Sequence, residues 1–228
     1  RMLTALELTG RAATHVQELA ELSCRLQPDA GRALLRMREA AREAGIDVGI
    51  ASAFRDFERQ LGIWSAKFRG ERRLLDRQGN EIAHASLDEP ALIEAILIWS
   101  ALPGASRHHW GTDIDVIDLA SLPAGGRPQL VPHEFAPGGC FAHLDRWLTE
   151  NMGRFGFFRP YTIDRGGVQP EPWHLSYGPV AVPALDALSL DILAQTIAAT
   201  DMPGQAQVLE RLPEIYERYV CAVEAPVS

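Results

Sequence analysis

The chain has 228 residues, of which 46% are hydrophobic and 23% are charged, a composition typical of a soluble globular protein of one domain. Its net charge of −8 argues against non-specific nucleic-acid binding, which requires a basic face. The longest apolar stretch, residues 91–102, is interrupted by Glu94 and falls short of the roughly 20 apolar residues that a membrane span needs.

The first part of the chain is predicted to be helical. Residues 9–26 place apolar side chains at helical spacing, and Pro28 ends that helix. A second helix is predicted from Asp29, as its N-cap, to Gly45, as its C-terminal stop. Alternation of β-branched and small residues then predicts a strand over residues 46–53.

An amphipathic helix is predicted next, from Asp56 to Gly70. Its apolar positions are Phe57, Leu61, Trp64 and Phe68. A loop or hairpin is expected around Gly79. After it, an apolar helix is predicted from Asp88 to about Ala101.

The second half of the chain mixes strands, loops and helices. Residues 106–119 are predicted to form a strand, a turn and a strand. The Pro- and Gly-rich residues 123–139 are too many for an ordinary connection, so a lid or insertion is expected there. A helix over residues 141–156 and short strands and loops over residues 157–177 precede a return to helix.

These elements predict an α+β fold with a small, mainly antiparallel sheet that carries the functional site. We expect one domain over residues 1–228, with a core at residues 46–180. Helices over residues 1–45 and 181–228 would flank that core at both ends.

The cysteines and the first residues of the sequence do not indicate the cellular compartment of the protein. The cysteines are far apart and form no Cys-x-x-Cys pair, so a thiolate zinc site is not expected and no disulfide can be assigned. They are Cys24, Cys140 and Cys221. The first residues, "RMLTALELTG", lack the apolar core of a signal peptide.

Histidines and carboxylates gather in two short segments. A catalytic zinc site needs about three nitrogen or oxygen ligands and a nearby general base, and His108, Asp115, Glu171 and His174 could supply them. The chain must turn between the first two, and Gly111 permits that turn. The residue types alone nevertheless favour a polar turn that carries histidines over a metal site.

The order of three motifs adds a specific resemblance. "SRHHWGTDID", residues 106–115, resembles the S-x-H-x-x-G-x-x-x-D motif of the VanY-like zinc D-alanyl-D-alanine carboxypeptidases. "EPWH", residues 171–174, resembles their E-x-W-H motif, and "SAFRDFERQ", residues 52–60, is similar to their S-G-Y-R-S-x-x-x-Q segment. This family belongs to the lysostaphin, D-Ala-D-Ala and hedgehog-type metallopeptidases.

The resemblance implies a role for each motif residue. His108, Asp115 and His174 would bind one Zn²⁺ per chain. Glu171 would be the catalytic base, which takes a proton from a zinc-bound water and passes it to the leaving amine. Arg55 would bind the terminal carboxylate of the substrate, because a guanidinium matches a carboxylate bidentately.

Ser106 and Gln60 also match motif positions. Each is expected either to contact substrate or to support the site, and a purely structural role is the alternative. Trp173 is expected to pack behind His174.

Two features depart from the family pattern. Asp113 stands where a small residue is usual, on the same strand face as Asp115, and would be a partner of the ligands or, alternatively, itself the ligand. His109 follows His108 directly; His108 is the expected ligand, because adjacent strand residues point to opposite faces.

The resemblance implies a D,D-carboxypeptidase that acts on peptidoglycan stem peptides. An L,D-carboxypeptidase, a D,D-dipeptidase or a stem-peptide endopeptidase of the same fold stays open, as does a non-catalytic zinc or binding module. The substrate lies outside the inner membrane, so we expect a periplasmic or cell-envelope protein, with a cytoplasmic one as the alternative. No nucleic-acid partner is expected, and the oligomeric state is left open.

Overall fold

The centre of the fold is a four-stranded antiparallel sheet. The computed structural model describes residues 1–227. Within them the strand order is β3-β6-β8-β7. The strands are β3 (Val48–Ser52), β6 (Asp113–Asp118), β7 (Phe157–Phe158) and β8 (His174–Tyr177).

Helices and two small hairpins surround this sheet. The hairpins are β1 (Gln17–Leu19) with β2 (Cys24–Leu26), and β4 (Leu74–Leu75) with β5 (Glu81–Ile82). The helices are α1 (Ala5–Leu8), α2 (Pro28–Glu43), α3 (Phe57–Phe68), α4 (Glu89–Trp99), α5 (Pro132–Phe135), α6 (Ala142–Asn151), α7 (Gly178–Ala187), α8 (Leu190–Ala198), α9 (Gln205–Glu210) and α10 (Leu212–Ile215). Short 3₁₀ turns are η1 (Ala20–Leu22), η2 (His84–Ser86), η3 (Arg107–Trp110), η4 (Leu119–Ser121) and η5 (Met152–Phe155), and the π-helical turn η6 (Tyr216–Cys221) follows α10.

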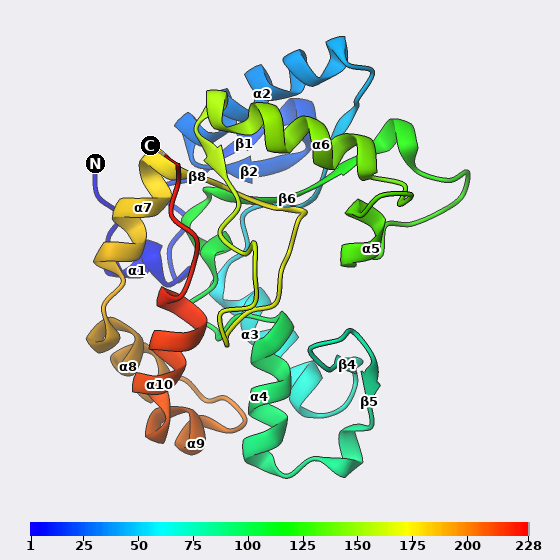
Figure 1. Ribbon diagram of the computed structural model, residues 1–228. Coiled ribbons are helices and arrows are strands. Elements are labelled where there is room, and N and C mark those ends of the chain that lie inside the picture. The colour runs from blue at the N-terminus through cyan, green and yellow to red at the C-terminus, as the bar shows by residue number, and fades with distance from the viewer. Residues whose placement is uncertain (228) are drawn as a thin grey trace.

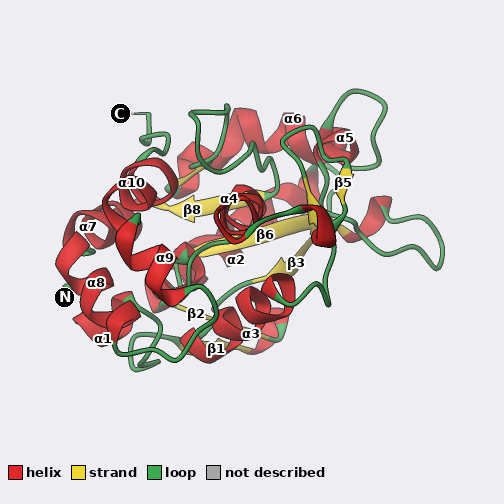
Figure 2. Ribbon diagram, turned by 90° about the horizontal axis from the view of Figure 1, so that it is seen from below, coloured by secondary structure: helices red, strands yellow, loops and turns green. Residues whose placement is uncertain are grey.

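The sheet lies between two helical layers. Helices α2 and α6 cover one face, and α3, α4 and the C-terminal helices lie on the other side (Figures 1 and 2). Ile114 and Val116 of β6 pack with α2 and α6 in one core cluster. Because strand residues alternate between faces, Asp113 and Asp115 project toward the opposite layer.

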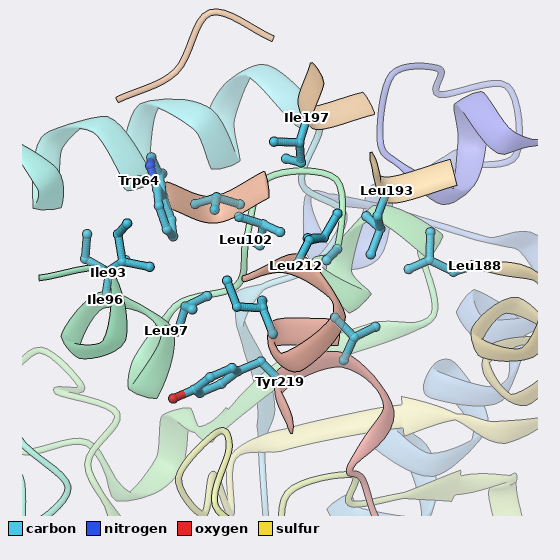
Figure 3. Packing of buried hydrophobic residues seen from close by; sticks show 14 of the residues in the cluster. Trp64, Ile93, Ile96, Leu97, Leu102, Leu188, Leu193, Ile197, Leu212 and Tyr219 are labelled. Carbon is cyan, nitrogen blue, oxygen red and sulfur yellow. The ribbon is translucent and has the colours of Figure 1, made fainter. Parts of the chain in front are cut away.

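A second core cluster lies among the helices of that opposite layer. It joins Trp64 of α3 and Ile96 of α4 to Leu193 of α8, Leu212 of α10 and Tyr219 of η6 (Figure 3). The C-terminal helices are therefore part of the main core, because they bury the apolar side chains that α3 and α4 leave uncovered.

The predicted starts of the central helices are confirmed. Asp56 and Asp88 each cap a helix by accepting a hydrogen bond from a backbone N–H in its first turn. Helix α2 begins at Pro28 and is capped by Gln27 instead of Asp29, since proline's fixed φ suits the first helical position.

The predicted helix over residues 9–26 is wrong. Gly10, at φ 72°, follows α1, and the rest of the segment contains the β1–β2 hairpin, with Gln17 opposite Leu26. Short apolar runs fit either a helix or a strand. Here Leu26 of β2 is buried in the same core cluster as the apolar side chains of α2. The first 45 residues are thus one short helix, a hairpin and α2.

The predicted strand at the start of residues 106–119 is also wrong. That segment forms η3, which Ser106 caps through a hydrogen bond from the His108 N–H. Gly111 then adopts φ 69° and leads into β6. A Cβ there would lie 2.4 Å from Val16 Cγ1 and 2.9 Å from the Gln27 nitrogen, so the turn requires glycine.

Other expectations can be compared directly with the described residues. The hairpin around Gly79 is present as β4–β5. Helix α5 lies within the predicted lid segment, residues 123–139. The cysteines are free thiols. No single described helix is long and apolar enough to span a membrane; α7 and α8 reach that length and composition only as a pair bent by 71°.

Candidate metal and catalytic site

Three elements bring the predicted ligands together. Asp115 of β6 pairs directly with His174 of β8 across the sheet. The turn at Gly111 folds η3 back beside β6, which brings His108 to the same place. One ligand atom from each of the three side chains lies within 4.8 Å of the other two, and all three residues are buried.

Each histidine uses one ring nitrogen for an anchoring contact. His108 Nδ1 lies 2.9 Å from the Ala53 carbonyl oxygen, which leaves Nε2 facing Asp115 Oδ2 at 3.5 Å. His174 Nε2 lies 2.7 Å from Asp113 Oδ2, which leaves Nδ1 3.7 Å from Asp115 Oδ1. The anchors fix both ring orientations and point the other nitrogen of each ring into the cluster.

These donors fit a zinc ion. Two imidazole nitrogens and a carboxylate form a set that zinc prefers at sites with an open position. In addition, Asp115 Oδ1 is buried and has no hydrogen-bond partner among the described residues. A buried, unpaired carboxylate oxygen is costly unless a cation or a donor meets it.

Asp113 is not one of the three clustered residues, but it contacts His174 directly and fixes the orientation of that ring. Its carboxylate receives hydrogen bonds from Arg107 Nε, Thr112 Oγ1 and Ser176 Oγ, in addition to its contact with His174. Burial acts to raise the pKa of Asp113, but the Arg107 guanidinium and His174 hold it well below its usual range. The geometry therefore matches the partner role considered for this residue.

The carboxylates around His174 raise the pKa of its ring. Burial alone lowers its pKa, yet hydrogen bonds to Asp113 and Glu171 and the charge of Asp115 raise the pKa to about 10. A metal ion that binds Nδ1 therefore competes with a proton.

Glu171 reaches the cluster from a turn. Its Oε2 lies 3.1 Å from His174 Nδ1, and its carbonyl accepts a hydrogen bond from the His174 N–H. Pro172 keeps the segment non-helical, as predicted. Trp173 is buried, with its ring 6.0 Å from that of Phe135.

Arg55 is held by neutral groups. Its Nη1 donates to Gln60 Oε1 at 2.8 Å and its Nη2 to Ser52 Oγ at 3.0 Å, while Nε is buried without a partner among the described residues. Burial lowers its pKa, opposed by the charge of Asp115. The guanidinium is thus preorganised beside the cluster, and no carboxylate of residues 1–227 pairs with it.

Ser106 and Gln60 take different positions. Ser106 caps η3 and lines the pocket beside the cluster. Gln60 is fully buried and joins Arg55 to the Ala101 carbonyl oxygen, so it supports the arginine.

His109 is separated from the cluster by its own contacts. Its Nδ1 lies 2.7 Å from the Arg55 carbonyl oxygen, and its Nε2 accepts from the Gly104 N–H. Burial lowers the pKa of His109 to about 4. The structural reason is the 3₁₀ turn, since His108 and His109 do not lie on a strand.

The cluster opens into a pocket of about 440 Å³. Besides the predicted residues, its lining includes cationic and aromatic side chains that the motifs did not identify: Lys67, Arg72, Arg73, Tyr161 and Tyr219. Lys67 could have been found from sequence, because it lies seven residues after Gln60 and therefore on the same face of the predicted helix. Tyr219 could not, because only tertiary packing brings η6 to the pocket.

Comparison with known proteins agrees with this geometry. The family model described as VanY, D-alanyl-D-alanine carboxypeptidase, matches residues 23–180. An uncharacterized protein of Haemophilus influenzae is 37% identical over 121 residues, which cover 52% of this chain and 92% of that relative.

Two solved structures share the fold. VanYB in complex with D-alanine-D-alanine has a TM-score of 0.52 and 25% identity, covering 82% of this chain and 91% of that one. A variant of the vancomycin-resistance D,D-pentapeptidase VanY in complex with Zn(II) has a TM-score of 0.50 and 27% identity, covering 72% and 79%. The matched residues 23–180 include every motif residue of the site.

Proposed function

This chain belongs to the VanY family of D-alanyl-D-alanine carboxypeptidases, and from that premise we propose that it is a zinc-dependent D,D-carboxypeptidase. Its reaction would be hydrolysis of the amide bond before the C-terminal D-alanine of peptidoglycan stem peptides. With that substrate, the protein would work in the cell envelope.

One observation carries this proposal. A zinc-compatible cluster, an adjacent carboxylate and a guanidinium without a carboxylate partner among residues 1–227 all line the same pocket: His108, Asp115 and His174, then Glu171, then Arg55. A carboxypeptidase needs these three functions side by side, because it must activate water next to a peptide bond whose leaving residue carries a carboxylate.

The proposed roles follow from position. His108, Asp115 and His174 would hold the zinc ion, which when bound supplies Lewis acidity toward water and the scissile carbonyl. Glu171 would take the proton from the attacking water and deliver it to the leaving amine. Arg55 would bind the terminal carboxylate in the pocket that it lines, with Gln60 and Ser52 fixing its orientation.

Other activities of the same fold differ in what occupies the far end of the pocket. Arg55, which has no carboxylate partner among residues 1–227, favours a substrate with a free terminal carboxylate over an endopeptidase substrate. Substrates of an L,D-carboxypeptidase or a D,D-dipeptidase would also carry that group. A non-catalytic zinc module would not need the Glu171 carboxylate beside the ligands.

The test uses defined muropeptides and mass spectrometry. Zinc-loaded wild type should release a single D-alanine from a pentapeptide. Glu171→Ala should lower turnover by roughly 100-fold or more while it retains one zinc ion per chain, because Glu171 is not among the proposed ligands.

Glu150→Ala, which changes an exposed carboxylate on α6, is the matched control and should keep full activity. Cleavage within the stem would indicate an endopeptidase. If zinc-loaded wild type cleaves none of the stem peptides, the proposal is wrong.

A further inference from the structure

The connection between β3 and α3, residues 53–56, is held against η3 at three points. The Ala53 carbonyl oxygen lies 2.9 Å from His108 Nδ1, and the Arg55 N–H donates to the His108 carbonyl oxygen at 3.2 Å. The third contact joins the Arg55 carbonyl oxygen to His109 Nδ1 at 2.7 Å. The backbone of Arg55 is therefore held on both sides by the turn that carries a proposed zinc ligand.

The ring of His109 is fully buried, and both of its nitrogens have partners. Its Nε2 accepts a hydrogen bond from the Gly104 N–H at 3.2 Å. A ring nitrogen that accepts a hydrogen bond carries no proton, so Nδ1 of the neutral ring carries it and donates to the Arg55 carbonyl oxygen. One imidazole thus joins Arg55 to the loop that follows α4.

Close packing restricts the His109 ring further. A Cβ on Gly10 would lie 2.4 Å from His109 Nδ1, so the backbone that follows α1 lies directly against the ring. Within residues 1–227, His109 belongs neither to the cluster of three ligands nor to the pocket lining. An effect of this side chain on the substrate must therefore pass through the groups that it holds.

The position of the Arg55 guanidinium depends on both its side chain and its backbone. Gln60 and Ser52 orient the guanidinium, whereas His109 holds the backbone from which the side chain extends. A carboxypeptidase must place the terminal carboxylate and the scissile carbonyl at the same time. A misplacement of about 1 Å in such an arrangement can cost roughly 100-fold in rate.

We propose that His109 is a positioning residue, which fixes Arg55 relative to the metal cluster and so gives the site its preference for a free terminal carboxylate. This inference rests on the proposed function, in which Arg55 binds that carboxylate. The second histidine of "SRHHWGTDID" then acts on the substrate through the Arg55 backbone, and not through the metal.

The test compares two pentapeptides that both end in D-Ala-D-Ala, one with a free C-terminal carboxylate and one amidated at the C-terminus. The measured quantity is the ratio of their kcat/KM values on zinc-loaded protein, which does not depend on the fraction of folded enzyme in a sample. Wild type should prefer the free carboxylate roughly tenfold or more, and Arg55→Met should bring the ratio to within about twofold of one.

Two amide variants separate the two contacts of the ring. In His109→Asn the side-chain nitrogen can take the place of Nδ1 and keep the bond to Arg55, while the bond from Gly104 is lost. In His109→Gln the side-chain oxygen can take the place of Nε2 and keep the bond from Gly104, while the bond to Arg55 is lost.

The two variants should therefore differ in substrate preference. We expect His109→Asn to keep the ratio within about twofold of wild type and His109→Gln to lower it roughly tenfold. The loss should appear as a higher KM for the free carboxylate, with little change in kcat. His143→Gln, at an exposed position on α6, is the matched control and should leave the ratio unchanged.

Three further measurements distinguish positioning from a general loss of structure. Chelator competition should show a zinc affinity within about threefold of wild type in both His109 variants, and the double variant Arg55→Met/His109→Gln should have the same ratio as Arg55→Met. Gly10→Ala would displace the ring without removing its hydrogen-bonding groups, so it should also lower the ratio.

The outcomes separate this inference from the proposed function. A wild-type ratio in His109→Gln or in Gly10→Ala, equal losses in His109→Asn and His109→Gln, or a further loss in the double variant would overturn the inference and leave the proposed function intact. A wild type that releases D-alanine equally well from both peptides would also overturn it, because His109 would then have no preference to set. Release of no D-alanine from either peptide would instead contradict the proposed function.

Discussion

At the scale of single residues, the informative departure from the family pattern is Asp113. A small residue at this position could not contact His174, whereas the carboxylate lies 2.7 Å from Nε2 of that ring. It is in turn held by Arg107, Thr112 and Ser176. A carboxylate that orients a metal-binding histidine fixes its tautomer and strengthens it as a ligand.

We predict that Asp113→Asn weakens zinc binding by roughly 10- to 100-fold. The amide is similar in size but neutral, and it can donate to Nε2, which would place the ring proton on Nδ1. Competition with a chromogenic chelator measures the affinity. Asp186→Asn, at an exposed position, is the control, and an unchanged affinity in Asp113→Asn would contradict the proposed partner role.

At the scale of elements, the turn from η3 to β6 brings the ligands together. Gly111 adopts φ 69° at this turn. Its carbonyl accepts a hydrogen bond from the Gln27 N–H, which fastens the turn to the start of α2. A helix of the HExxH kind would bring ligands together by its own periodicity, whereas here a backbone turn and a cross-strand pair replace it.

We predict that Gly111→Ala destabilises the protein by roughly 2 to 4 kcal/mol, from left-handed strain and a clash together. The added Cβ would meet Val16 and the Gln27 backbone. Zinc affinity should fall with stability, because His108 and Asp115 lie on either side of the turn. Denaturant unfolding and chelator competition measure the two effects.

Gly45→Ala is the matched control. Gly45 has φ 77°, and an added Cβ would meet nothing within 4 Å, so only the conformational strain of about 1 kcal/mol is expected. Equal losses of unfolding free energy in the two variants would show that the contacts around Gly111 do not contribute to the effect of the substitution.

At the scale of the whole molecule, the C-terminal helices complete both the core and the pocket. Glu94 of α4 accepts from Arg211 at 3.1 Å, from Arg218 at 2.7 Å and from Tyr219 Oη at 2.5 Å. This network ties the end of the chain to the helix beside the pocket, and Tyr219 itself lines the pocket.

We predict that Glu94→Gln lowers the free energy of unfolding by about 1 kcal/mol, because the carboxylate is partly exposed and its ion pairs are screened. KM should rise as well, since Tyr219 is less firmly held. Thermal unfolding and steady-state kinetics test both effects. Glu89→Gln, at an exposed position on the same helix, should change neither, and an unchanged KM in Glu94→Gln would separate the C-terminal helices from the pocket.

Local signals in the sequence predicted the ends of several helices and the residues of the candidate site. Capping aspartates located the starts of α3 and α4, and Gly70 located the end of α3, because helix ends depend on neighbouring backbone groups. The motif residues His108, Asp115, Glu171 and His174 were identifiable because three motifs, in order, resemble those of the VanY-like family. The same local patterns failed for the β1–β2 hairpin and for η3, where contacts with distant residues decide the conformation.

Only the tertiary structure decided which side chains share the pocket. The anchoring of His174 by Asp113, the hydrogen bond from Lys67 to Ser100 and the position of Tyr219 in the pocket lining all depend on contacts between segments far apart in the chain. Burial and charge pairing belong to the packed molecule, so no local pattern can reveal that a cation lacks a counter-ion. The sequence by itself identified the candidate metal-binding residues, and packing determined what surrounds them.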